Sequence, residues 1–216
     1  MASPAVGQML QHALAKPLVF AVALGPFFYM LWAVFTNALG PNPAEALIRA
    51  TGDWTLRFLC ITLAVTPLRQ LTGQGQLLRF RRMLGLFTFF YGVVHMLCYS
   101  GFDMAFDLGD IVRDIIKRPF ILAGFTALLL LTPLAATSFN RAIRAMGAAR
   151  WQLLHKLVYA VAVVALVHFW WMRSAKHNFS EPAIYIAIII VLFGWRLWHR
   201  WHGASALRVR PAARNA

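Results

Sequence analysis

Six apolar runs, each long enough to cross a membrane, constrain this sequence more than any other feature. They cover Pro17–Phe35, Trp54–Leu71, Met83–Tyr99, Phe120–Ala136, Trp151–Met172 and Pro182–Trp201. Each run has about 17–22 residues, and about 20 residues of α-helix cross the hydrocarbon core of a bilayer. Charged residues make up only 13% of the chain, whereas soluble domains carry about 25%. The sequence therefore predicts an all-α membrane protein built as a bundle of six transmembrane helices.

The lengths of the remaining segments indicate a single membrane domain. We expect a cytoplasmic N-terminus over residues 1–16, the helical domain over residues 17–201 and a basic cytoplasmic tail over residues 202–216. The first apolar run is too long for a cleaved signal peptide, and no small-residue cleavage site follows it. No G-x-G-x-x-G fingerprint of a dinucleotide-binding domain is present.

The distribution of charge predicts the orientation. The chain carries 21 Lys and Arg residues and 7 Asp and Glu residues. If the N-terminus is cytoplasmic, most basic residues fall in cytoplasmic segments, and all acidic residues fall at or beyond the outer ends of the runs. Because cytoplasmic loops are enriched in Lys and Arg, we expect both termini inside. A net charge of +14 is also typical of nucleic-acid-binding proteins. Here the basic residues are scattered at the ends of apolar runs, so we expect no nucleic acid partner.

Two histidines lie at the same depth in different runs. An ionisable side chain inside a membrane is costly, by about 2.5 kcal/mol or more for a charged type, and usually marks a cofactor or an ion path. His95 and His168 each lie four residues inside the outer end of a run. Two imidazoles on facing helices are the ligands of a bis-histidine haem, so we predict that both bind haem iron. The alternative is a pair of buried histidines that bond to the backbone or to each other.

A third histidine, His155, lies near the inner end of the fifth run. On one continuous helix it stands roughly 20 Å from His168 and about 140° around the axis, so a second haem in line needs a bend. The third run offers only Met83 as a weak ligand at that level. A second haem bound by His155, or a contact of His155 with a flavin or quinone, is therefore an open alternative.

Three further features bear on a cofactor site. Arg57 lies a few residues inside the second run. It either extends to the outer surface or pairs with a haem propionate. Gly85 and Gly92 share one face of the third run and allow another helix or a flat macrocycle to approach. The segment from Asp103 to Arg118 has apolar residues at helical spacing, which indicates a helix on the outer membrane surface or a docking surface for a protein.

Several motifs across the chain resemble one family. They are Arg81–Gly85, Tyr91–His95, Ile115–Ile121, Pro133–Ser138, Trp151–Tyr159 and Val167–Phe169. The sequence resembles MsrQ, the family of haem-binding membrane subunits of bacterial MsrPQ methionine sulfoxide reductase systems. Its wider relatives are the ferric reductase-like transmembrane domains, which include NADPH oxidases. Those relatives carry two histidines on each of two helices, whereas this chain has one in the third run and two in the fifth.

The resemblance implies a non-catalytic electron-transfer subunit in the inner membrane of a Gram-negative bacterium. It implies haem b at His95 and His168, and FMN as a further cofactor. It also implies that electrons come from the quinone pool or a cytosolic flavin reductase, and that they go to MsrP, a periplasmic molybdenum enzyme. Since no flavin- or nicotinamide-binding domain follows the sixth run, we expect a separate electron donor.

Two other functions stay open on the sequence alone. One is a stand-alone metalloreductase that acts on a small acceptor such as ferric iron. The other is a transporter in which histidines relay protons. Transporters of this kind more often have carboxylates inside the membrane or internal repeats. The six runs contain no Asp or Glu, which favours the haem protein.

Overall fold

The long helices of the protein follow the apolar runs. The computed structural model describes residues 4–174 and 179–208, and these residues form helices joined by short loops, with no strand among them. The α-helices are α1 (Pro4–Gln11), α2 (Ala15–Phe35), α3 (Pro43–Thr72), α4 (Leu78–Phe102), α5 (Leu108–Lys117), α6 (Pro119–Ala136), α7 (Asn140–Met146), α8 (Ala148–Leu154), α9 (Leu157–Ser174) and α10 (Ser180–Arg208). A 3-10 helix, η1 (Gly75–Leu77), precedes α4. Part of the expected basic tail, residues 209–216, lies outside the described residues.

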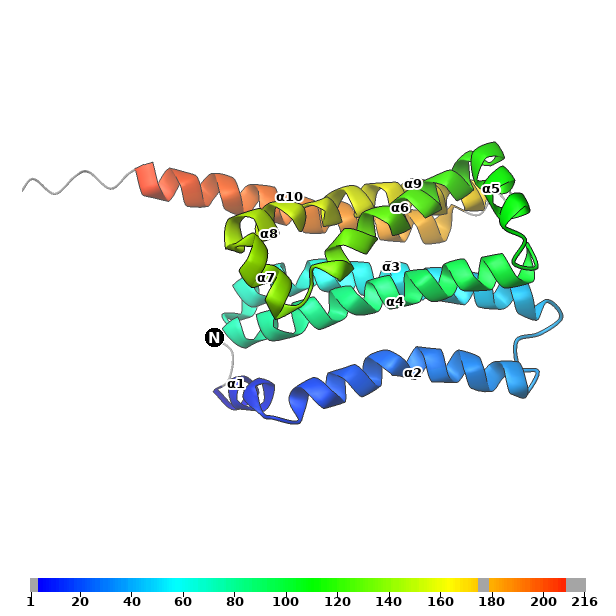
Figure 1. Cartoon of the computed structure of the whole chain (residues 1–216). Coiled ribbons are helices and arrows are strands. Elements are labelled where there is room, and N and C mark those ends of the chain that lie inside the picture. Colours follow the sequence, from blue (N-terminus) through cyan, green and yellow to red (C-terminus); the bar gives the residue numbers. More distant parts are fainter. Residues whose placement is uncertain (1–3, 175–178, 209–216) are drawn as a thin grey trace, which may run out of the picture.

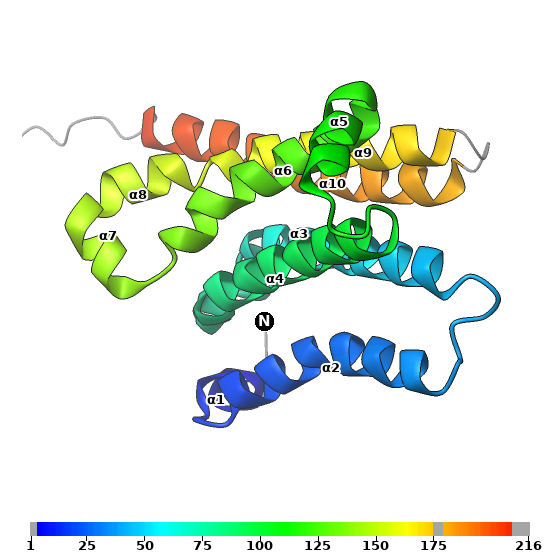
Figure 2. The same cartoon turned by 45° about the vertical axis from the view of Figure 1, so that its right-hand side comes forward.

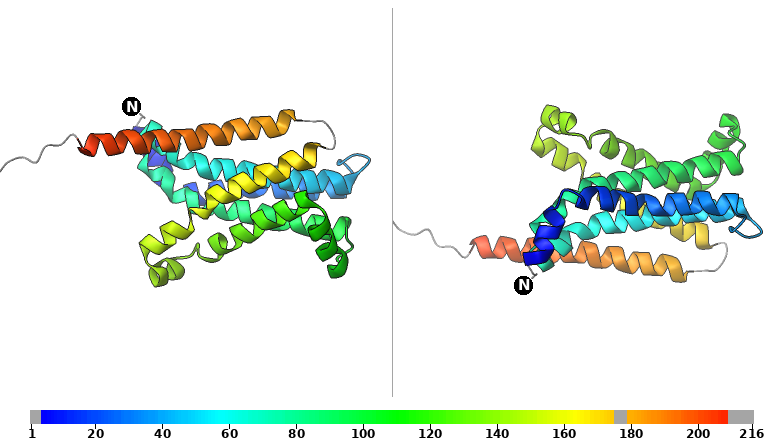
Figure 3. Two further views of the ribbon diagram at one scale, coloured as in Figure 1. Left: turned by 90° about the horizontal axis from the view of Figure 1, so that it is seen from above. Right: turned by 90° about the horizontal axis from the view of Figure 1, so that it is seen from below.

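The long helices lie roughly along one direction in three layers (Figure 1). The first layer is α2 alone, the second is the pair α3 and α4, and the third contains α6, α9 and α10. Short helices close the two ends, with α5 at one end and α7 and α8 at the other (Figure 2). Seen from above, the third layer lies in front, and seen from below, α2 lies in front of α3 and α4 (Figure 3).

The prediction of an all-α membrane protein is confirmed. Among the described residues, five helical segments are long and apolar enough to cross a membrane: Ala15–Phe35, Gly75–Phe102, Pro119–Ala136, Ala148–Ser174 and Ser180–His202. The remaining long helix, α3, has 30 residues but carries Arg49, Asp53 and Arg57 in its first half. A count of six membrane spans, with α3 as the sixth, stays a prediction.

Helix α3 begins earlier than the sequence pattern predicts. Its first residue is Pro43, whereas the second apolar run begins at Trp54. The Asn42 side chain accepts a hydrogen bond from the Glu45 amide (3.2 Å), and Pro43 occupies the first turn, where its missing N–H costs nothing. Glu45, Arg49 and Asp53, which precede the second apolar run, therefore stand on the first turns of a helix.

The fifth apolar run, Trp151 to Met172, lies within one apolar helical segment that is long enough to cross a membrane, Ala148–Ser174, but a short turn interrupts the helix in this segment. Helix α8 ends at Leu154 and α9 begins at Leu157. In the turn between them, the Lys156 amide bonds to the Leu153 carbonyl (3.1 Å) and the Tyr159 amide to the Lys156 carbonyl (3.0 Å). These hydrogen bonds join residues three apart in place of four and tighten the backbone. The angle of about 140° between His155 and His168, which holds for a regular helix, therefore does not describe this segment.

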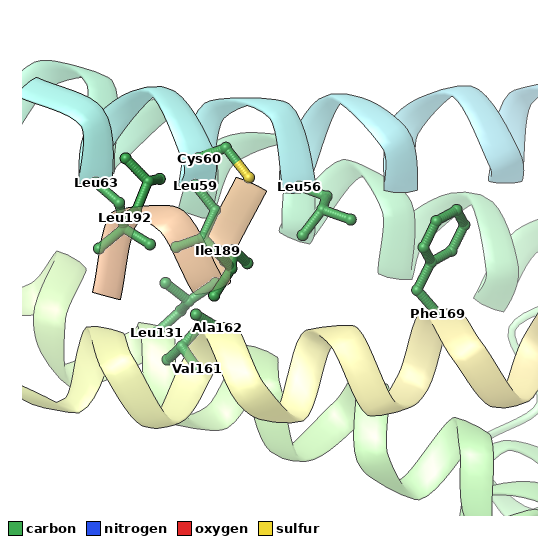
Figure 4. Close-up of a cluster of buried hydrophobic side chains, with 10 residues drawn as sticks. All are labelled: Leu56, Leu59, Cys60, Leu63, Leu131, Val161, Ala162, Phe169, Ile189 and Leu192. Atoms are coloured by element: carbon green, nitrogen blue, oxygen red, sulfur yellow. The ribbon is translucent and has the colours of Figure 1, made fainter. Parts of the chain in front are cut away.

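The apolar core that joins the second and third layers lies beside the histidines. Leu56 and Leu59 from α3 point toward Val161 and Ala162 of α9, and Phe169 stands further along α9 (Figure 4). A second cluster, built from side chains of α2, α3 and α4, attaches the first layer to the second. The third layer is thus packed on α3 and α4 by a core that contains no charged side chain.

Candidate haem-binding site

His95 on α4 and His168 on α9 face each other between the second and third layers. Their ring centres are 6.2 Å apart and their planes are inclined by 70°. A bond from a transition-metal ion to imidazole is about 2 Å, and the ring centre lies about 1.2 Å behind the nitrogen, so two imidazoles on opposite sides of one ion have centres about 6.4 Å apart. The observed separation matches this value.

Both imidazoles are held by their Nδ1 atoms. His95 Nδ1 donates to the Ile48 carbonyl of α3 (2.8 Å), and His168 Nδ1 donates to the Phe120 carbonyl of α6 (2.6 Å). A carbonyl oxygen only accepts, so each Nδ1 carries a proton and each neutral ring keeps the lone pair of Nε2. This is the tautomer that a metal-binding histidine needs, with a backbone carbonyl as the partner of its second nitrogen.

The two histidines have equivalent surroundings. Each lies on the second helix of a packed pair, α3 with α4 and α6 with α9, and each bonds to the first helix of its pair. One turn after the bonded carbonyl, the first helix has a glycine against the imidazole: Gly52 beside His95 and Gly124 beside His168. Sequence reasoning missed both glycines. A glycine four residues after a helical position that faces a histidine would have been the signal.

The glycines that the sequence analysis did select have a different role. A Cβ on Gly85 would lie 3.6 Å from Thr62, and a Cβ on Gly92 would lie 3.4 Å from Leu128. These are ordinary packing distances. Gly85 and Gly92 therefore contribute to helix packing, although Gly92 also lines the cavity beside the histidines.

A cavity of about 280 Å³ surrounds the histidine pair, and its charged residues lie toward one end. Aliphatic residues of α3, α6 and α9 form its inner part, among them Leu56, Leu59, Leu131 and Val161. Its outer end has four charged residues: Arg49, Asp53, Asp103 and Arg118. A porphyrin has an apolar ring system and carries its two carboxylates on one edge. The distribution of apolar and charged residues in the cavity therefore matches the distribution of apolar and charged groups in a haem.

The charged end of the cavity is anchored by hydrogen bonds. Arg118 Nε lies 2.8 Å from an Asp114 oxygen, and the Tyr99 hydroxyl donates to the other Asp114 oxygen (2.7 Å). Arg49 pairs with Glu45 one turn earlier on α3. Burial raises the pKa of the Asp103 carboxyl, with Arg118 opposing this shift. Both arginines are thus held near the cavity by acidic neighbours and keep further N–H groups for another acceptor.

Arg57 does not line this cavity. Its guanidinium stacks over the Trp54 ring at 4.7 Å and donates to the Tyr185 hydroxyl of α10 (3.3 Å). The structure thus places Arg49 and Arg118 at the cavity and turns Arg57 toward α10. Sequence reasoning missed Arg49 and Arg118 because both were assigned to outer loops.

His155 lies away from the pair, in the turn between α8 and α9. Its ring packs on Trp151 with centres 3.9 Å apart, and its Nε2 lies 3.3 Å from the Thr137 hydroxyl. The Trp151 indole donates to the Thr137 carbonyl (2.9 Å). His155 does not line the cavity around His95 and His168. Met83, its expected counterpart, packs in the cluster of α2, α3 and α4.

The residues present fit a haem. The pair would supply two neutral imidazoles as ligands of the haem iron. Within residues 4–174 and 179–208, no group of three or more His, Cys, Asp and Glu side chains is placed to hold a bare metal ion.

Comparison with known proteins assigns the chain to a family. It is 64% identical over 192 residues to the protein-methionine-sulfoxide reductase heme-binding subunit MsrQ of Polaromonas naphthalenivorans, covering 89% of this chain and 88% of that protein. The chain belongs to the MsrQ family. The MsrQ proteins of Ralstonia nicotianae and Herminiimonas arsenicoxydans are 50% and 47% identical, with coverage of 86% of both chains for the first and of 90% and 89% for the second.

The wider family agrees with this assignment. Residues 51–166, more than half of the chain, match the family described as ferric reductase like transmembrane component. This match includes His95 and His155 and ends two residues before His168. No solved structure matches the MsrQ-family chain.

Proposed function

We propose that this chain is the haem-binding electron-transfer subunit of a methionine sulfoxide reductase system. One observation carries the proposal. The ring centres of His95 and His168 are 6.2 Å apart, close enough for both imidazoles to bind one iron ion, and a backbone carbonyl binds the Nδ1 atom of each. The names of the MsrQ relatives support the same function.

The chain contributes ligands, orientation and a dry environment. His95 and His168 would hold the haem iron through Nε2, and the carbonyls of Ile48 and Phe120 orient the two rings through Nδ1. The aliphatic inner part of the cavity excludes water, which keeps the site apolar. Haem b, when bound, supplies reversible one-electron chemistry of iron.

The charged outer end suits the haem carboxylates. We assign the propionate partners to Arg49 and Arg118, in place of Arg57, because these two guanidiniums line the cavity. Guanidinium and carboxylate form strong paired hydrogen bonds. Both arginines already have an acidic neighbour and keep further N–H groups, with which they would hold a haem propionate.

The proposed setting is the bacterial inner membrane, crossed six times with both termini in the cytoplasm. The histidine pair then lies toward the periplasmic side, and α5 covers that end of the bundle. The electron acceptor that we propose is a periplasmic molybdenum enzyme similar to MsrP.

The proposed donors act from the other side. We propose that electrons reach the protein from the quinone pool or from a cytosolic flavin reductase, with FMN as a further cofactor, as the family resemblance implies. His155 lies near Arg81 and Arg82 at the inner end. A second haem there stays a prediction, and the haem-to-protein ratio in wild type and His155→Ala tests it.

The absorbance spectrum of the purified protein tests the central proposal. Oxidised and dithionite-reduced samples of wild type are compared with His95→Ala, His168→Ala and a control, His202→Ala, whose side chain is exposed. We expect a low-spin b-type spectrum in wild type and in the control, and its loss in both ligand variants. A colourless wild type after haem-replete expression would reject the proposal and favour the transporter.

A second measurement separates the electron-transfer subunit from a stand-alone metalloreductase. The dithionite-reduced protein is mixed with ferric citrate or with an MsrP-type enzyme and methionine sulfoxide. We expect fast reoxidation only with the enzyme and its substrate present. Fast reoxidation by ferric citrate alone would favour the metalloreductase.

A further inference from the structure

We infer that Gly52 and Gly124 are positioning residues for the two histidine ligands, each acting with the carbonyl four residues before it. The inference rests on the proposed haem site and goes beyond it, since neither glycine touches the iron. It concerns how the fold sets the hydrogen bond and the plane of each imidazole.

The α-helix itself explains why a glycine is needed. The carbonyl of residue n accepts the amide of residue n+4, and one lone pair of its oxygen stays free. The Cα–Cβ bond of residue n+4 tilts toward the helix N-terminus, so its side chain covers that oxygen. A donor from another helix reaches the oxygen most directly where residue n+4 has no side chain.

Both histidines use this arrangement. His95 bonds to the Ile48 carbonyl, and residue n+4 is Gly52. His168 bonds to the Phe120 carbonyl, and residue n+4 is Gly124. The same unit thus occurs twice, once on α3 and once on α6, although the two segments share no obvious sequence similarity beyond the glycine.

The free space at these glycines is taken by the imidazoles. A Cβ added to Gly124 would lie 2.8 Å from both Cε1 and Nδ1 of His168. A Cβ added to Gly52 would lie 3.1 Å from Cε1 and 3.3 Å from Nδ1 of His95. Each contact is closer than side chains normally permit, so alanine would displace the ring and lengthen its hydrogen bond. The effect should be larger at Gly124.

A matched control lies in α10. Gly194 is also helical, and a Cβ there would meet nothing within 4 Å. Alanine favours the helix over glycine at all three positions. A role of Gly52 and Gly124 in helix structure alone therefore predicts that all three alanine variants are as stable as wild type or more stable, with unchanged haem properties.

The experiment uses the full-length detergent-purified proteins with three readouts. Haem affinity comes from titration of the apoprotein, the ligand planes from the electron paramagnetic resonance spectrum of the ferric form, and the ligand strength from the midpoint potential. Elution from a size-exclusion column reports the folded fraction. We expect haem affinity to fall about 10–100-fold in Gly124→Ala and less in Gly52→Ala. In both variants we also expect shifted g values and a higher potential, because a ligand that loses its hydrogen bond donates less charge to ferric iron.

The outcomes are distinct. Equal affinity, spectra and potential in Gly52→Ala, Gly124→Ala and Gly194→Ala would overturn the inference while the haem site stands. A wild type that takes up no haem would overturn the proposed function and the inference with it. If Gly124→Ala does not fold, Gly52→Ala decides, because its closest contact is 0.3 Å longer and the ring can shift to accommodate it.

Discussion

The hydroxyl of Tyr91 donates a hydrogen bond to the backbone carbonyl of Ala23 (2.8 Å), although Tyr91 lies on α4 and Ala23 on α2. The same hydroxyl accepts the amide of Phe27 (3.1 Å). In a regular helix the Phe27 amide would bond to the Ala23 carbonyl directly. Pro26, the residue before Phe27, has no N–H, so this turn of α2 has one backbone hydrogen bond fewer. A fully buried side chain of the second layer therefore completes the hydrogen bonding of the helix that forms the first layer.

Tyr91→Phe tests how strongly this hydroxyl attaches α2. We expect the free energy of unfolding to fall by about 1 kcal/mol. The Ala23 carbonyl and the Phe27 amide lose the hydroxyl as a partner, and only one hydrogen bond can form between them in its place. Tyr91→Ala should cost about 3–5 kcal/mol, since it also leaves a cavity. The measurement is thermal unfolding in detergent, with Tyr29→Phe as control because that side chain is 63% exposed. A melting curve of Tyr91→Phe that coincides with wild type would contradict the expectation.

The assignment of the propionate partners predicts different effects for three arginines. Arg49→Ala and Arg118→Ala should each lower haem affinity by about 10-fold or more, since each removes a charge-assisted hydrogen bond. Both should also lower the midpoint potential, because reduction adds negative charge to a site that has lost a positive group. Arg57→Ala, the control from α3, should change neither. Redox titration and apoprotein titration check this, and an effect confined to Arg57→Ala would reverse the assignment.

Asp103 predicts a pH-dependent potential. Burial raises the pKa of its carboxyl; Arg118 opposes this shift, and Asp114 and Glu45 add to it. Below that pKa the side chain is neutral, and above it a carboxylate at the cavity disfavours reduction. We therefore expect the midpoint potential to fall as pH rises through this pKa. Asp103→Asn should remove this slope and keep the higher potential. The control is Asp110→Asn on α5, and an unchanged slope in Asp103→Asn would exclude the role.

The ion pair between Arg173 and Glu181 links the ends of α9 and α10. Arg173 is 6% exposed and packs on Phe169, and its Nε has no partner within the described structure. Glu181→Gln should lower stability by about 1–2 kcal/mol, because the buried charge loses its counter-ion while the half-exposed carboxylate is screened by water. Arg173→Met should cost less, since it removes the buried charge itself. Thermal unfolding shows which of the two variants is less stable. A less stable Arg173→Met would contradict the idea that burial of the Arg173 charge has a net cost.

The sequence predicts the paired histidines well, for a geometric reason. Two parallel helices with a histidine at the same distance from the same membrane surface place their imidazoles at one level, and the structure brings His95 and His168 together. The extents of α2 and α6 also follow from apolar composition, because lipid requires an uninterrupted stretch, whereas α4 begins five residues before its apolar run.

Other features depend on contacts that a single sequence does not reveal. The Asn42 cap makes α3 begin at Pro43, although the charged residues that follow suggest a loop. The turn at His155 interrupts an apolar run that, by its composition, predicts one helix. Gly52 and Gly124 act on residues 43 and 44 positions away along the chain. Their role becomes visible only when α3 is packed on α4 and α6 on α9.

The polar outer half of α3 has a consequence for the biogenesis of the protein. More residues are buried in α3 than in any other described helix. Of its charged side chains, Arg57 contacts Tyr185 of α10, and Arg49 and Asp53 line the cavity. A segment with Arg49, Asp53 and Arg57 is poorly suited to leave the insertion machinery alone, because each charge is costly in lipid. We expect α3 to enter the bilayer together with α4, as a hairpin formed across Gly73. Assembly of the histidine site would then begin during insertion, when the Ile48 carbonyl and His95 first come within reach.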